Sequence, residues 1–361
     1  MATFKIYQPF DQSDIISGKT NVISSGFFPG GEISMSQSSF RTSSAQTKGT
    51  GSNGIYDVLN GMYYTNVYNP SVANPQILFS ISYGDFYGGG VKTGSVFKNT
   101  KAIYSQFKNL LLGTVDQDGL FSFKTGSSAS STYITSSEIF VLSFSSDLMR
   151  DQIDRGQWAF TISGANTSGS LHLVDEYAIL TEAEKKEQRL VYQIVSGSFD
   201  DTTGQSVGLD SYHGLGLFYP KNGIMILNAE KIKQYAGHSY NNSTSSAVDV
   251  FNHRNLFSKI HLASGVMRLR KSELVPSTHY FVRVKNQDFN FSNNPSFVYQ
   301  TATNGHSKGE IITSLQVTPK SYITTVGLYN EMNELLAIAK LSRPSRKAFD
   351  SELLVRIRLD F

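Results

Sequence analysis

The sequence predicts a β-rich protein of the α+β class, with a mixed or antiparallel sheet core, a few packed helices, an extended N-terminal arm and a C-terminal hairpin followed by a terminal strand. Three observations predict this class. The C-terminal residues alternate apolar and polar side chains. The 361 residues include 30 glycines and long Ser/Thr/Asn tracts, which suit many short strands joined by turns. Residues 76–113 combine a strand with an amphipathic helix.

Residues 1–75 are rich in Ser, Gly, Asn, Thr and Tyr, with only short apolar islands. Such a segment buries little of its own surface, so it either stays mobile or becomes ordered along a partner. We therefore expect an extended arm over residues 1–75.

Residues 76–164 are expected to form an α+β core. A strand at 77–83 leads through a glycine-rich loop tip at 88–90 to a helix over 96–112, whose apolar residues recur at helical spacing. Further strands are predicted at 139–144 and around Trp158, Phe160 and Ile162, with a helical turn near 148–153. The helix should pack on the sheet.

Residues 165–310 differ from the preceding residues in their sequence pattern, and they are expected to form a β-rich inserted or second domain. Strands are predicted at 171–174 and 190–196, and a hairpin at 215–227. One helix should begin after Asn228, and another after Ser246, where Asp249 completes a pattern similar to a capping box.

Residues 311–361 are expected to close the core. Strands at 322–329 and 335–341 flank a turn at 330–333, which predicts a hairpin. In the terminal strand, one face should carry five apolar residues and the other three polar residues. These are Leu353, Val355, Ile357, Leu359 and Phe361 on the first face, and Arg356, Arg358 and Asp360 on the second.

Composition restricts the possible functions. Charged residues make up 17% of the chain, against about 25% in a typical domain. The chain has no cysteine, which excludes disulfides, thiolate metal sites and cysteine nucleophiles. A net charge of +3 does not indicate nucleic-acid binding, and we interpret the locally basic residues 254–285 as a solvated or interface face. We expect neither a signal peptide nor a membrane span.

Motifs for catalysis or cofactor binding are weak. Gly49, Gly51 and Gly54 match a dinucleotide fingerprint, but no strand precedes them and no acidic residue follows at the required distance. The seven histidines are scattered, and Asp200 and Asp201 lie in a polar turn. We therefore expect no enzyme, no cofactor and no metal site.

Two clusters of aromatic residues are candidates for contact surfaces. They are Tyr63, Tyr64 and Tyr68, and Tyr83, Phe86 and Tyr87. Such clusters line protein interfaces, pack in cores or stack on sugars, and interface is the reading we favour. With Arg356, Arg358 and Phe361 of the terminal strand, they are the predicted interface residues.

Two segments resemble virion structural proteins of contractile-tailed bacteriophages. They are residues 321–330 (SYITTVGLYN) with 334–341 (ELLAIAKL), and residues 79–84 (FSISYG) followed by 100–112. In order and position they are similar to baseplate wedge subunits of myoviruses, especially the β-rich dimeric ones. The likeness covers about a third of the chain and includes no catalytic signature.

The resemblance implies a structural subunit that is made in the host cytoplasm and built into the tail baseplate of the virion. Its partners would be other baseplate proteins, with this chain present as a homodimer or in several copies. Such a subunit would transmit the contraction trigger by changing which interfaces are formed. The alternative is a tail fibre or receptor-binding module that contacts host surface glycans, and a tail-associated hydrolase ranks third.

Overall fold

The computed structural model describes most of the chain and divides it into two compact units. Unit 1 contains Met1–Asn21 and Leu274–Phe361, and unit 2 contains Val22–Glu273. The residues described are 9–42, 63–69, 76–91, 94–95, 98–111, 119–127, 130–164, 170–187, 189–200, 205–208, 211–237, 251–263, 265–292, 294–302 and 304–360. Strands predominate and several antiparallel sheets are present, which confirms the predicted β-rich α+β class.

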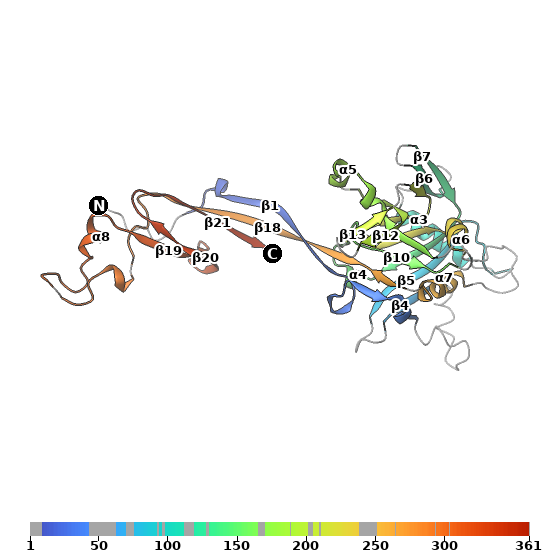
Figure 1. Cartoon of the computed structure of the whole chain (residues 1–361), viewed down its shortest axis with the longest axis horizontal. Coiled ribbons are helices and arrows are strands. Elements are labelled where there is room, and N and C mark those ends of the chain that lie inside the picture. The colour runs from blue at the N-terminus through green and yellow to red at the C-terminus, as the bar shows by residue number, and fades with distance from the viewer. Residues whose placement is uncertain are drawn as a thin grey trace. The chain divides into compact units, whose positions relative to one another are not determined.

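A ten-stranded antiparallel sheet forms the centre of unit 2 (Figure 1). Its strands lie in the order β10-β11-β12-β15-β16-β8-β5-β4-β3, and β13 pairs with β12. Their bounds are β3 (Arg41–Thr42), β4 (Tyr64–Tyr68), β5 (Ile77–Asp85), β8 (Glu138–Phe144), β10 (Phe160–Ile162), β11 (Leu171–Asp175), β12 (Tyr192–Asp200), β13 (Gln205–Gly208), β15 (Gly216–Tyr219) and β16 (Ile224–Asn228).

Both faces of this sheet are buried, because side chains of its central strands alternate between two apolar clusters. In β8, Phe140 and Leu142 belong to the larger cluster, whereas Ile139 and Val141 belong to the smaller one. Helices α6 (Ala229–Ala236) and α7 (Asn252–His261) cover the first face, and α3 (Asn99–Leu110) with strand β6 covers the second. Central strands that are covered on both faces have nearly continuous apolar sequences.

Smaller elements complete unit 2. They are the three-stranded sheet β14 (Ser211–His213), β6 (Phe121–Ser127) and β7 (Ser131–Ser136); the pair β2 (Ser34–Ser36) and β17 (Val266–Arg268); strand β9 (Gln152–Ile153); the helices α4 (Ser146–Met149) and α5 (Glu182–Lys186); and the 3₁₀ helices η2 (Pro29–Gly31), η3 (Gln37–Ser39) and η5 (Glu176–Ile179).

Local sequence explains where several of these helices lie. The Asn228 side chain accepts hydrogen bonds from the backbone N–H groups of the first turn of α6, and Gly237 ends that helix in the left-handed conformation. Helix α3 comes close to β5 at Gly84, where an added Cβ would lie 3.0 Å from the backbone nitrogen of Tyr104. Glycine therefore permits this close packing.

Unit 1 contains two small antiparallel assemblies, whose C-terminal strands are orange and red in Figure 1. Strand β18 (Arg270–Val284) lies between β1 (Ile15–Gly26) and β21 (Leu353–Asp360), and β19 (Ser321–Tyr329) pairs with β20 (Leu335–Lys347). The unit boundaries fall within β1 and β18. The 3₁₀ helices η1 (Gln12–Asp14) and η6 (Pro295–Phe297) and helix α8 (Thr313–Val317) complete it.

The predicted C-terminal hairpin and terminal strand are confirmed. Strands β19 and β20 form the expected hairpin, and β21 is the expected terminal strand. Val355 and Ile357 are buried, whereas Arg356 and Arg358 are exposed, as the alternation predicted. Phe361 lies outside the described residues.

The predicted arm differs from the structure. Among the described residues of this region, Phe27, Phe28, Phe40 and Val67 are buried in the larger cluster of unit 2, and β3 and β4 extend the ten-stranded sheet. The segment is polar on average, so its composition does not indicate burial. Its few large apolar side chains are nevertheless enough to hold it in the core. Residues 1–8, 43–62 and 70–75 lie outside the described residues.

The structure also divides the chain differently from the predicted domain boundaries. Strands β10 to β16, expected in a second domain, share one sheet with β5 and β8, and the last strands build a small core of their own with β18. Long-range packing determines which strands pair with one another. Local changes of composition along the chain do not indicate this packing. The predicted helix start at Ser246 and Asp249 lies outside the described residues, and α7 is described from Asn252.

The loop at 88–90 is not an open tip. Its glycines are buried, and the Thr100 hydroxyl donates to the Gly89 carbonyl oxygen at 2.9 Å.

In the part of the chain that the structure describes, no helix has the length and apolar character needed to cross a membrane.

Candidate functional site

The β19–β20 hairpin of unit 1 presents apolar side chains on both of its faces. Ala337, Ala339 and Leu341 of β20 pack against the small core of unit 1. Next to Ala337 along the strand, Leu336 and Ile338 are 68% and 63% exposed. The second face therefore has no cover among the described residues, although its composition suits burial.

The hairpin tip is held in one conformation by hydrogen bonds around Asn330. Its side-chain oxygen accepts from the N–H of Met332 at 3.0 Å and from that of Glu334 at 2.8 Å. Its amide nitrogen donates to the Glu334 carboxylate at 2.7 Å, and Asn333 adopts a positive φ of 62°. Met332 is 81% exposed at this tip. A side chain presented on a fixed turn loses little further backbone entropy on binding.

Tyr329 lies across the backbone of β19 at Gly327. A Cβ added to Gly327 would lie 2.9 Å from the Tyr329 ring and 3.1 Å from Leu335. Gly327 is opposite Ile338 in the strand pairing, so the ring, Leu335 and Ile338 adjoin one another. We call Tyr329, Met332, Leu335, Leu336 and Ile338 the apolar hairpin surface.

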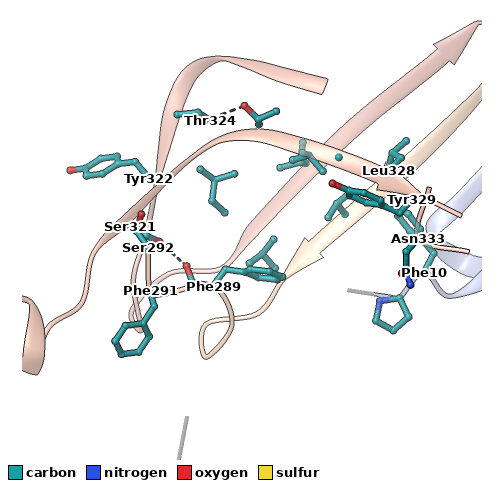
Figure 2. A pocket seen from close by; sticks show the side chains of 18 of the residues that line it. Phe10, Phe289, Phe291, Ser292, Ser321, Tyr322, Thr324, Leu328, Tyr329 and Asn333 are labelled. Carbon is teal, nitrogen blue, oxygen red and sulfur yellow. Dashed lines mark hydrogen bonds between the residues drawn. The ribbon is translucent and has the colours of Figure 1, made fainter. Parts of the chain in front are cut away.

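A groove of about 790 Å³ runs beside β19 (Figure 2). Every residue of β19 lines it, together with apolar side chains of the neighbouring strands and loops. These are Phe10, Val282, Val284, Phe289, Phe291 and Val355. Among its described lining residues, Glu331 is the one charged side chain. Its volume is that of a typical ligand site, and polar side chains such as Ser292, Thr324 and Asn333 line it beside the apolar ones.

One end of the groove is fixed by a buried lysine. The Lys347 ammonium is fully buried and donates to the carbonyl oxygens of Asn286 and Ala348 at 2.8 and 3.1 Å and to the Asn290 side chain at 3.0 Å. Burial lowers the pKa of Lys347. The Ser321 hydroxyl donates to the Phe289 carbonyl oxygen at 2.7 Å, which joins this loop to the start of β19.

The predicted arginines lie on the polar face of β21. The Arg356 Nε is 3.2 Å from His279 Nδ1, and the Arg358 guanidinium is 3.1 Å from the Asp360 carboxylate. Asp360 also accepts a hydrogen bond from the Ser277 hydroxyl at 2.8 Å. These arginines are exposed and engaged within unit 1, as solvated surface groups commonly are.

The predicted aromatic clusters belong to unit 2 and have different surroundings. Tyr83 is buried in the core, and the Phe86 ring lies 5.5 Å from that of Tyr104. Tyr87 is exposed. This cluster is thus mainly part of the fold and leaves one ring exposed.

In the other cluster, Tyr63 and Tyr64 are exposed beside and within β4. Tyr68 is half-buried and donates to the Thr42 carbonyl oxygen at 3.0 Å. The structure does not gather the tyrosines and the arginines in one unit, and sequence reasoning missed the apolar hairpin surface. Its signal was the run 335–341, which is apolar on both alternating faces.

The most perturbed carboxyl group of unit 2 serves the fold. Asp175 is fully buried, and burial raises its pKa to about 7. Its oxygens accept hydrogen bonds from the Gly156 N–H at 2.8 Å and the Trp158 indole N–H at 3.1 Å. Asp175 lines neither the groove of unit 1 nor the smaller cavity of unit 2 described below, so it does not reach a substrate through either.

The smaller cavity of unit 2 has a volume of about 280 Å³. His172 and Arg268 line it, with the His172 Nδ1 2.9 Å from the Thr161 hydroxyl and the Arg268 guanidinium 4.8 Å from the Phe199 ring centre. Its described lining contains no carboxylate to act with the histidine in acid–base chemistry. Nor do the described residues include a group of three His, Asp or Glu side chains that could hold a metal ion.

Comparisons with protein-family models, with characterised proteins and with solved structures found no match to this chain.

Proposed function

We propose that this protein is a structural subunit of a contractile phage tail baseplate, which assembles through protein–protein interfaces. The observation that carries the proposal is the apolar hairpin surface of unit 1. Leu336, Ile338 and Met332 expose most of their side chains on a hairpin whose turn is already fixed. Contiguous exposed apolar surface marks sites of interaction in folded proteins.

The chemistry of this surface favours a protein partner. Its members are aliphatic side chains and methionine with one tyrosine, whereas a glycan site needs aromatic platforms combined with polar groups that bind hydroxyls. Burying each of the large aliphatic side chains against another subunit contributes roughly 1.5–3 kcal/mol. The resemblance of residues 321–330 and 334–341 to wedge subunits falls on the same hairpin.

The same surface supports a proposed role in transmitting the contraction trigger. An interface made by a few side chains on one hairpin can be exchanged as a unit when neighbouring subunits move. Exchange of such contacts is one way in which assemblies transmit a conformational signal.

Size-exclusion chromatography with mass measurement tests the proposal, first on the protein alone and then after mixing with the other tail proteins of the same virus. We expect a stable complex with itself or with a baseplate protein. The substitution Ile338→Asp should weaken that complex at least tenfold, because a carboxylate buried in an apolar interface loses its hydration. Leu336→Asp should act in the same way.

Ser342→Asp is the matched control, because it places the same charge on an exposed residue of the same strand outside the apolar hairpin surface. It should leave association unchanged. All three variants should keep the unfolding free energy within about 0.5 kcal/mol of the parent. A stable monomer that binds oligosaccharide and ignores tail proteins would overturn the proposal in favour of a receptor-binding module.

A further inference from the structure

The buried lysine of unit 1 makes its hydrogen bonds to neutral groups. Lys347 has no exposed surface, and its acceptors among the described residues are two carbonyl oxygens of the main chain and the side-chain oxygen of Asn290. Fully buried lysines are usually paired with an acidic group. Burial lowers the pKa of Lys347, so a larger share of its amine is neutral than in an exposed lysine. A neutral, desolvated amine is a nucleophile.

The Asn290 side chain places an electrophilic carbon beside this amine. The Lys347 Nζ is 3.0 Å from the Asn290 Oδ1. Because a C=O bond is about 1.23 Å long, Nζ lies no more than about 4.2 Å from the Asn290 Cγ. Asn290 is 2% exposed, and its Nδ2 donates to the Asn286 carbonyl oxygen at 2.8 Å, which fixes the amide group. Two groups that are held together in this way react as if at a very high local concentration.

A carboxylate that can transfer protons lies two residues before Asn290. Asp288 is 8% exposed, and its backbone N–H donates to the Lys285 carbonyl oxygen at 3.1 Å. Burial has the largest effect on the pKa of Lys347, and the Asp288 carboxylate opposes it more strongly than any other charged group. A carboxylate near a buried amine can act as a base and then as an acid.

We propose that Lys347 and Asn290 form an isopeptide bond within folded unit 1. The Lys347 Nζ bonds to the Asn290 Cγ, and the bond between Cγ and Nδ2 breaks. The Asp288 carboxylate passes the two protons that Nζ loses to the leaving nitrogen. An ammonium and a primary amide thus give a secondary amide and one ammonium ion, and the reaction needs neither an oxidant nor a cofactor.

The main-chain acceptors of the site keep hydrogen bonds when the isopeptide bond forms. The secondary amide retains one N–H, which can donate to the Asn286 carbonyl oxygen, 2.8 Å from Nζ. The Ala348 carbonyl oxygen keeps the backbone N–H and the hydroxyl of Ser351, at 3.1 and 3.2 Å. Both buried carbonyl groups therefore stay satisfied, as folded proteins require. Until the bond forms, the lysine ammonium holds the same groups by hydrogen bonds.

The bond joins the two antiparallel assemblies of unit 1. Asn290 lies in the loop after β18, and Lys347 is the last residue of β20. Unit 1 has a small core, and the chain has no cysteine to form a disulfide. A covalent link keeps the two assemblies together when force acts on either of them. This inference concerns unit 1 alone and does not depend on the proposed function.

Intact-protein mass spectrometry of the denatured full chain tests the bond. We expect a species that is lighter than the sequence by one ammonia molecule, in a share that rises while the folded protein is incubated. A protease digest of this species should contain one branched peptide that joins Asn290 to Lys347. Lys347→Arg keeps a cation but cannot form the bond, so it should show the full mass. Lys340→Arg, on an exposed residue of the same strand, is the matched control and should keep the loss of ammonia.

Two further variants separate the chemistry from folding. Asn290→Ala removes the electrophilic carbon and should show the full mass, which keeps the test valid if Lys347→Arg does not fold. Asp288→Asn keeps both reacting groups and should slow bond formation at least tenfold, with an unchanged circular dichroism spectrum.

The proposal would be overturned if the parent keeps the full mass of its sequence after incubation. A loss of ammonia that maps to one asparagine, without a branched peptide, would also overturn it, because cyclisation of asparagine to a succinimide releases ammonia too. Bond formation at the parent rate in Asp288→Asn would overturn the role of Asp288.

Discussion

The two units of this protein bury their apolar residues to different extents. In unit 2, both faces of a ten-stranded sheet are covered, and large side chains such as Trp158 and Phe140 have no exposed surface. In unit 1, the five buried side chains of the core all remain 6–9% exposed. Unit 2 therefore has a fully buried core that stabilises it. Unit 1 has a small core and leaves many of its apolar side chains exposed.

This difference separates folding from interaction within one chain. A small unit buries a lower fraction of its surface than a large one, so each core contact contributes less to its stability. Five of the apolar residues that unit 1 leaves exposed form the apolar hairpin surface, which we assign to contacts with other subunits. The following predictions test the contrast.

The largest effect should come from a matched pair of core truncations. Ile226 in β16 is fully buried in unit 2, and Ile357 in β21 belongs to the core of unit 1. Ile226→Ala should lower the free energy of unfolding by about 4 kcal/mol and Ile357→Ala by about 2, because a more open site relaxes or admits water. Urea unfolding, with hydrogen exchange to locate the change in each unit, measures both values. Equal losses would contradict the contrast between the cores.

Asp175 should make the stability of unit 2 depend on pH. Its pKa is about 7 in the folded protein, against an ordinary value of 3.8 in the unfolded chain. Because the folded pKa is the higher one, this stability is fully present below pH 3.8 and is lost as pH rises through 7. Between pH 5 and pH 8 the expected loss is about 2–3 kcal/mol.

Urea unfolding at the two pH values checks this, with Asp175→Asn as the comparison. The amide does not titrate, so the variant should lose this part of the pH dependence even if its overall stability is lower. An unchanged slope in Asp175→Asn would assign the pH dependence to another group.

In unit 1, Lys347→Met should lower the unfolding free energy by about 1–3 kcal/mol. The substitution keeps an apolar stem but removes the donor that satisfies Asn286, Asn290 and Ala348 in a buried site. Chemical denaturation measures the loss, and hydrogen exchange should show it in the loop before η6. Lys340→Met, on the exposed side of β20, is the control and should be nearly neutral.

The smallest effect should come from an exposed ion pair between the end of β20 and the loop that follows it. The Arg346 guanidinium is 3.1 Å from the Asp350 carboxylate, and both side chains are solvated. Arg346→Ala should change the unfolding free energy by less than about 0.5 kcal/mol. A larger loss in urea unfolding would mean that surface charge, and not only burial, stabilises unit 1.

The sequence could predict those features that depend on neighbours along the chain. The hairpin β19–β20, the alternating faces of β21 and the start of α6 after Asn228 all follow from local spacing and capping. The exposed apolar hairpin surface could not be predicted, because a run with apolar residues on both faces is equally consistent with a strand covered on both sides. Which face is covered depends on packing.

By itself, the sequence determined a strand-rich chain with a hairpin and a terminal strand at its end, since propensity, turns and alternation act over a few residues. Only the tertiary structure decided that Phe27, Phe28 and Phe40 join the core of unit 2 and that β16 pairs with β8. It also decided that Leu336 and Ile338 stay exposed. The physical reason is that burial is set by contacts between segments far apart in the chain, and these contacts leave little trace in the spacing of nearby residues.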